Sequence, residues 1–86
     1  MTEEREQELR EDAETGRRYK IAMEVWRDFL DNRREELMRT LEEKYCEDWV
    51  LHDITNELRV MKLFRDVSYR NIQRGEIAEE ELAHGE

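Results

Sequence analysis

The sequence predicts an all-α protein: an antiparallel helical hairpin of two long helices, which is expected to oligomerise into a helical bundle or ring. The stretch 17–74 lies between Gly16 and Gly75 and contains neither glycine nor proline. Its apolar residues recur at steps of three and four, the spacing of one face of an α-helix. The same stretch holds both tryptophans, all three tyrosines and both phenylalanines. It is therefore the part of the chain expected to form a core.

The first helix is expected at about 17–45, with Thr15 and Gly16 as its start signal. Six polar residues at 31–36 interrupt its apolar stripe. Because no glycine or proline lies there, we expect a continuous helix in which the aliphatic stem of Arg33 or Arg34 bridges the gap. A break in the helix at this point is the alternative.

A turn is expected at 46–49, where the apolar stripe changes phase. Asp48 can serve as the N-cap of a second helix that begins at Trp49. This helix is expected at about 49–74, with Gly75 as its C′ residue. One unbroken helix is the alternative, but a helix of that length needs sustained heptads.

The apolar arc of the second helix is wider than one partner helix can cover, because Val60 and Leu63 extend it on one flank. A chain of 86 residues with 45% charged residues also has little material for a core of its own, so help from a second subunit is expected. The side chains expected to form a self-association or partner interface are Trp26, Phe29, Trp49, Leu58, Met61, Phe64 and Val67.

The flanks differ from the middle in charge. Residues 1–16 are expected to form an acidic flexible arm, whose apolar anchors are Leu9 and Ala13 alone, and residues 76–86 an acidic tail that can add a short helix. Residues 1–15 contain seven acidic and two basic residues, and the tail contains five acidic residues and no basic one. These flanks account for the net charge of −9.

Within the hairpin, residues 17–34 carry +3, residues 35–58 carry −6 and residues 59–74 carry +4. A basic end is therefore expected where the chain enters and leaves the hairpin, and an acidic end at the turn. Nucleic acid is expected to bind there only weakly, since the acidic flanks lie beside the basic end. The candidate basic patch consists of Arg17, Arg18, Lys20, Arg70 and Arg74.

No pattern in the sequence indicates catalysis, so we expect no enzyme, no metal and no cofactor. The single cysteine, Cys46, and His52 lack the further ligands that a metal site needs. There is no phosphate-binding glycine loop and no Ser/His/Asp arrangement. The start of the sequence has no apolar signal region and no window approaches a membrane span, so no membrane contact and a cytoplasmic location are expected.

The apolar spacing of the second helix and its ending are similar to those of a known group of proteins. The residues concerned are Trp49, Ile54, Glu57-Leu58, Met61 and Phe64, then Gly75-Glu76-Ile77-Ala78, preceded by Glu35-Glu36-Leu37. Over about residues 19–82 the chain resembles short, mostly uncharacterised helical-hairpin proteins of tailed bacteriophages. The resemblance includes no catalytic or ligand-binding motif. It implies a phage origin, among virion and packaging proteins, and a place in the host cytoplasm or the virion.

Three functions are therefore considered. The first is a non-enzymatic structural or assembly protein that binds itself and another protein, as a virion or DNA-packaging component. The second is an acidic anti-defence inhibitor that mimics nucleic acid; the net charge favours it, and the near-neutral middle of the chain opposes it. The third is a nucleic-acid-binding oligomer like a small terminase subunit, which would use the two basic segments.

Overall fold

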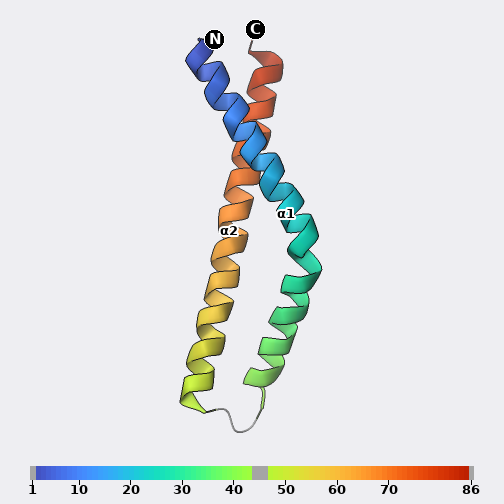
Figure 1. The fold of residues 1–86 in the computed structure, drawn as a ribbon, viewed down its shortest axis with the longest axis vertical. Coiled ribbons are helices and arrows are strands. Elements are labelled where there is room, and N and C mark those ends of the chain that lie inside the picture. The colour runs from blue at the N-terminus through green and yellow to red at the C-terminus, as the bar shows by residue number, and fades with distance from the viewer. Residues whose placement is uncertain (1, 44–46, 86) are drawn as a thin grey trace.

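The protein is an antiparallel hairpin of two helices in a computed structural model that describes residues 2–43 and 47–85. Helix α1 spans Glu3–Leu41 and helix α2 spans Asp48–His84, and the described residues contain no strand. Both chain ends lie at the same end of the rod (Figure 1). The molecule measures 62 × 20 × 13 Å. Its radius of gyration is 18.5 Å, whereas a compact chain of this length has one of about 12 Å. The predicted all-α hairpin is confirmed.

Both helices extend into the predicted flexible flanks, so the prediction of an unstructured arm is wrong over the described residues. Helix α1 begins at Glu3, and the Thr2 hydroxyl caps it by accepting a hydrogen bond from the Arg5 backbone N–H at 3.2 Å. Three glutamates in the first turn are favourable beside the positive end of the helix. Helix α2 runs on through the acidic tail to His84. Flank side chains buried against each other stabilise these turns.

At the turn, the helix bounds also differ from expectation. Helix α1 ends at Leu41, with Glu42 as its C-cap, rather than near residue 45. Helix α2 has Glu47 as its N-cap, without a side-chain hydrogen bond, and Asp48 is its first residue rather than its cap. The rest of the predicted turn, including Cys46, lies outside the described residues. The polar segment 31–36 is helical throughout, as the sequence predicts.

Gly16 and Gly75 are not helix boundaries; they lie inside α1 and α2, where the two backbones cross. A Cβ on either glycine would stand 2.8 Å from the Cα of the other. The Cβ on Gly16 would also stand 2.9 Å from the Asn71 carbonyl oxygen, and the Cβ on Gly75 would stand 3.0 Å from the Asp12 carbonyl oxygen. Each glycine instead carries a hydrogen at the position of the Cβ. This geometry is typical of weak Cα–H···O contacts between packed helices. Glycine is therefore required by this close approach, and not by a turn.

The best-buried apolar side chains lie in two places. Beside the crossing, Leu9 (2% exposed), Ala13 and Ala78 (1% each) form a cluster on which Leu82 packs. Near the turn, the buried residues are Leu37 and Ile54, at 4% and 5% exposure. Between these places the helices diverge (Figure 1), and in this middle section the fully buried side chain is Ser68, whose hydroxyl donates to the Phe64 carbonyl at 2.7 Å.

Because the flanks are helical, the rod has three zones of charge rather than two. The terminal zone, 3–14 with 76–84, carries 11 acids and two bases. The middle zone, 17–34 with 59–74, carries 11 bases and four acids. The zone nearest the turn, 35–43 with 47–58, carries eight acids and one base. The expected basic end is thus wrong: the bases lie in the middle, and the chain ends lie in an acidic zone.

Candidate functional site

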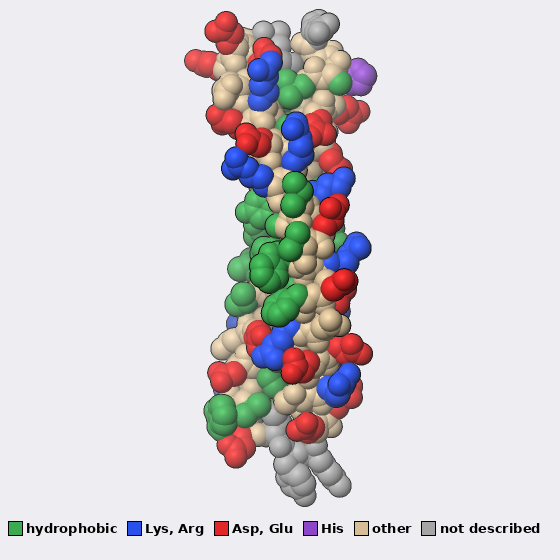
Figure 2. All heavy atoms as spheres, turned by 45° about the vertical axis from the view of Figure 1, so that its right-hand side comes forward, with side chains coloured by type: hydrophobic (Ala, Val, Ile, Leu, Met, Phe, Trp, Pro, Cys, Tyr) green, Lys and Arg blue, Asp and Glu red, His purple; other side chains and the backbone are tan. Residues whose placement is uncertain are grey.

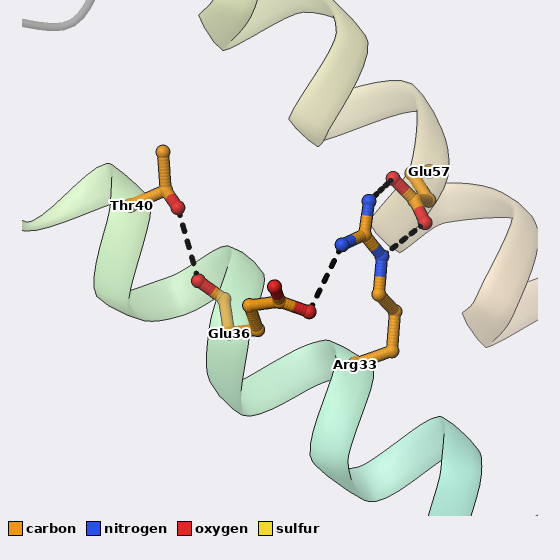
Figure 3. Close-up of polar contacts among 4 residues, drawn as sticks. All are labelled: Arg33, Glu36, Thr40 and Glu57. Atoms are coloured by element: carbon orange, nitrogen blue, oxygen red, sulfur yellow. Dashed lines mark hydrogen bonds and ion pairs between the residues drawn. The ribbon is translucent and has the colours of Figure 1, made fainter.

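Two ion pairs between the helices mark opposite sides of the hairpin. On one side, Arg33 of α1 binds Glu57 of α2 (Figure 3). Arg33 follows Phe29 by four residues, and Glu57 precedes Val60 by three, so the pair joins the surface rows that hold Phe29 and Val60. On the other side, Asp31 and Arg65 approach to 3.9 Å. Each side can therefore be described separately.

The Arg33–Glu57 pair is bidentate. Nε of Arg33 donates to one carboxylate oxygen of Glu57 at 2.7 Å and Nη2 donates to the other at 3.0 Å. Nη1 donates to Glu36 at 3.0 Å (Figure 3). The hydrogen bonds from Arg33 lower the pKa of the Glu57 carboxyl. The hydrogen bonds that Arg33 donates, those to Glu57 first and the one to Glu36 second, raise the pKa of the Arg33 guanidinium. The planar, paired geometry fixes how the two helices face each other at this height.

The Arg33–Glu57 side carries an exposed apolar surface in the middle of the rod, which we call the apolar face. Figure 2 shows hydrophobic side chains gathered there, with charged side chains above and below. Each of its members is exposed by half or more, from Trp26 at 50% to Val25 at 68%. We define the apolar face as Ile21, Val25, Trp26, Phe29, Val60 and Leu63.

Two features make the apolar face resemble the core of a protein interface. The rings of Trp26 and Phe29 pack edge to face, with centroids 5.6 Å apart and planes at 77°. This arrangement is a favoured one for aromatic pairs and holds both rings in place before any partner arrives. Ion pairs close the two ends of the face: Arg18–Glu14 at 2.6 Å towards the termini and Arg33–Glu57 towards the turn. An apolar centre with a polar rim is typical of interfaces.

The predicted interface residues fall in three different surroundings. Trp26 and Phe29 belong to the apolar face, and Phe64 and Val67 are half-buried. Trp49 is 64% exposed and lies apart, in the first turn of α2. The remaining two, Leu58 and Met61, are half-buried and line a groove described below.

The interface expected from sequence did not include Ile21 and Val25, and Val60 and Leu63 were noted only as widening the apolar arc of the second helix. The signal was nevertheless present, since Ile21, Val25 and Phe29 are spaced by four and form a second row beside the core stripe.

The predicted basic patch is not a single cluster of free charges. Arg17 binds Glu79 at 2.7 Å and Arg18 binds Glu14 at 2.6 Å. Lys20, Arg70 and Arg74 are exposed and form no ion pair within residues 2–43 and 47–85. The patch expected from sequence is therefore partly neutralised by the acidic flanks, which are ordered beside it.

The described part of the chain can be assessed for metal binding and for membrane spanning. It contains no group of three or more His, Cys, Asp or Glu side chains placed to hold a metal ion. Neither helix, over those residues, is long and apolar enough to cross a membrane. No protein-family model, no curated protein and no solved structure matches the chain. Function is therefore inferred from the residues of the chain itself.

Proposed function

We propose that the chain is a non-enzymatic assembly protein that self-associates through the apolar face. The observation that supports this proposal is the exposure of six large apolar side chains on one side of the hairpin. Together they expose on the order of 700 Å², whereas the largest apolar patch of a typical monomer measures about 300–600 Å². A stable interface covers about 800 Å² on each partner. The apolar face with its rim has that size.

The total surface also supports association. The chain exposes 7310 Å², but a compact monomer of its mass exposes only about 5,500 Å². The excess is about 1,800 Å². In the middle of the rod, the exposed surface includes the apolar face, whose burial in an interface would be favourable. Two hairpins packed face to face would form a four-helix bundle, in which the wide apolar arcs of both copies are covered.

Oligomeric mass tests the proposal directly. The variant Val25→Glu places a carboxylate in the centre of the apolar face. The matched control Ile77→Glu makes the same change at a side chain that is 52% exposed and lies outside the face. We expect the natural chain and the control to exceed the monomer mass of 10.6 kDa in light scattering. Val25→Glu should stay helical but become monomeric. A natural chain that is monomeric at high concentration would refute the proposal.

Salt provides a second test of the same interface. Face-to-face contact brings together two middle zones, and on each of them six of the 11 bases but only one of the four acids lie away from the opposite, Asp31–Arg65 side. Like charges that approach within the Debye length, about 8 Å at physiological salt, repel less when salt is added. Self-association should therefore become tighter as salt rises. An interface formed by attraction between acidic and basic zones would weaken instead.

The setting we propose for this assembly is a tailed-phage virion or its DNA-packaging machinery. The resemblance to phage helical-hairpin proteins supports it. Fractionation of infected cells with an antibody against the chain tests it: the chain should sediment with particles or with packaging complexes. Recovery only as a free soluble oligomer would contradict this setting while leaving self-association untouched.

An acidic mimic of nucleic acid remains the second candidate. One observation favours it: the acids of residues 3–14 stand on an ordered helix, as a mimic requires. Several of them, however, are paired with arginine, as in Arg10–Glu6 and Arg18–Glu14. Paired carboxylates present less of the uniform negative charge of a phosphate backbone, so assembly is the better-supported function.

A further inference from the structure

A groove runs along the opposite side of the hairpin, the side of the Asp31–Arg65 pair. Three adjoining hollows of about 230, 220 and 460 Å³ follow one another from the middle of the rod towards the turn. Neighbouring hollows share lining residues; Leu30 and Arg65, for example, line both the second and the third. On α1 the groove extends from Lys20 to Met38, which corresponds to about 27 Å of helix at 1.5 Å per residue. We call it the methionine groove.

Methionine and leucine line the space between the helices here. Three of the four methionines of the chain are lining residues: Met23, Met38 and Met61. Leu30, Leu58 and Ile72 add to the apolar lining, and all three are half-buried. Methionine side chains are flexible and polarisable, so they adapt to partners of irregular shape and are common at binding surfaces.

The edges of the methionine groove are basic. Lys20, Arg27 and Arg34 are spaced by seven residues and therefore form one row along α1. Lys62 and Arg65 line it from α2. Against these five bases, three acids line the groove: Glu24, Asp31 and Asp66.

The bases that line the groove have few ion-pair partners. Within the described residues, Lys20, Arg27, Arg34 and Lys62 form no ion pair, and Arg65 has only the contact of 3.9 Å to Asp31. By contrast, Arg5 and Arg10 of the terminal zone, and Arg17 and Arg18 next to it, are each paired with a glutamate at 2.9 Å or less. The groove thus combines an apolar lining with positive charge that the hairpin leaves uncompensated.

We propose that the methionine groove binds an acidic amphipathic helix of another protein. A third helix is the natural shape for the channel between two antiparallel helices, since its side-chain ridges fit the grooves of both. Its apolar face would pack on the methionines and leucines, in the helix-in-groove manner. Carboxylates on its flanks would face the bases of α1 and α2. A groove of this length accommodates about 18 residues of helix at 1.5 Å each.

Charge and burial favour this occupant over a second copy of the chain. The acidic segments of the chain itself lie in the terminal zone and in the zone nearest the turn, and each exposes few large apolar side chains. Among the described residues these are Ile77 in the first zone and Met38, Trp49 and Leu51 in the second. Leu9, Ala13 and Ala78 are at most 2% exposed, and Leu82 packs on them. A second copy therefore offers no acidic helix of the length of the groove with a continuous exposed apolar stripe.

Nucleic acid fits the methionine groove less well than an acidic helix does. The lining is aliphatic and thioether rather than aromatic, Tyr69 excepted. The three lining acids would repel phosphates, and the salt-dependent gain from phosphate binding needs uninterrupted positive charge.

The proposal goes beyond self-association, because the methionine groove and the apolar face lie on opposite sides of the hairpin. A face-to-face bundle would leave the grooves of both copies outside, where each could hold a partner helix. The protein would then join copies of itself on one side and a second protein on the other.

Peptide binding tests the proposal. The probe is a fluorescein-labelled synthetic helix of about 18 residues, with leucine on one face, glutamate on its flanks and alanine elsewhere. A matched peptide has lysine in place of every glutamate, and a labelled DNA oligonucleotide is the third probe. All are titrated by fluorescence anisotropy at physiological salt against the full chain. We expect the acidic peptide to bind in the micromolar range and the basic peptide and DNA to bind at least tenfold more weakly.

Charge reversal then locates the site. The double variant Arg34→Glu, Lys62→Glu should bind the acidic peptide about tenfold more weakly, or weaker still. It should bind the basic peptide more tightly than the natural chain does. The control Arg59→Glu with Arg70→Glu makes the same change in net charge at exposed bases outside the groove, and should leave the affinity within about threefold. Helicity by circular dichroism confirms that each variant folds.

Three results would overturn the proposal: no binding of the acidic peptide at about 1 mM, equal losses in both double variants, or preferential binding of the oligonucleotide. The monomeric variant Val25→Glu should bind the acidic peptide as well as the natural chain does. Failure of self-association is thereby distinguished from failure of the groove.

Discussion

Replacement of Gly16 by alanine is the sharpest test of how the two helices are held together. Glycine lowers the stability of a helix interior by about 1 kcal/mol relative to alanine. In an isolated helix Gly16→Ala would therefore be stabilising. In the hairpin the new Cβ would stand 2.8 Å from the Cα of Gly75 and 2.9 Å from the Asn71 carbonyl oxygen. Both obstacles are backbone atoms inside α2, so neither can rotate away as a side chain would.

The cost follows from the distance that the helices must move. Ordinary van der Waals contact of a Cβ begins at 3.4 Å, so the 2.8 Å approach requires a separation of at least 0.6 Å. A gap of about 0.5–1 Å forfeits a quarter to a half of the dispersion energy of each affected contact. The contacts affected include those of the buried cluster around Leu9 and Ala13. Overpacking of this kind costs about 1–3 kcal/mol. We expect a cost near the upper value, because the new methyl group meets backbone atoms that cannot rotate away.

After the helix-propensity gain is subtracted, Gly16→Ala should lower the free energy of unfolding by about 2 kcal/mol. For a chain of this size that corresponds to a Tm lower by about 8–16 °C. Thermal unfolding followed by circular dichroism measures it, with all chains at one concentration because association makes Tm concentration-dependent. Thr15→Ala, at an exposed position one residue away, is the control and should raise Tm slightly.

A second substitution tests the mechanism rather than the size of the effect. Gly75→Ala alone should be as harmful as Gly16→Ala, because the approach is reciprocal. The double variant should cost less than the sum, since one separation of the helices serves both new methyl groups. If Gly16→Ala unfolds at the same temperature as the natural chain or higher, the close crossing is refuted.

Three further predictions concern the ends, the buried layer and pH. Removal of residues 3–15 and 76–84 deletes the buried cluster at the termini, so the shortened chain should lose most of its helical circular dichroism signal; a shortened chain that keeps full helicity per residue would contradict this. Ile54→Ala, at a site 5% exposed, should cost about 2–5 kcal/mol in denaturant unfolding, and Leu58→Ala clearly less, because Leu58 is only half-buried; equal costs would contradict the assigned burial. The folded-state pKa of Glu57 is lowered, so its contribution to stability should be present above its unfolded-state pKa and lost as pH falls through its folded-state pKa. Glu57→Gln should therefore be less stable than the natural chain at neutral pH and equal to it in acid, and a pH-independent difference would refute the pairing.

Part of the candidate site could be predicted from periodicity, and the missing part had a local signal. The sequence indicated an apolar arc wider than one helix can cover and selected Trp26 and Phe29, which lie on the apolar face. It did not separate them from Leu58 and Met61, which line the opposite side. That separation depends on how α1 and α2 are aligned against each other, which the Arg33–Glu57 ion pair shows. The apolar pattern of a single helix does not contain this information.

The sequence by itself determined that the chain is helical and that it folds back once. The three- and four-residue spacing, the absence of proline and the change of phase near residue 46 are local properties, and local properties decide secondary structure. Where the helices end was decided only by tertiary structure. Gly16 and Gly75 have the local character of boundaries, but each lies inside a helix because the other backbone occupies the place of its side chain. The acidic flanks are too poor in apolar residues to order themselves alone, and they become helical because Leu9 and Ala13 meet Ala78 and Leu82 across the crossing.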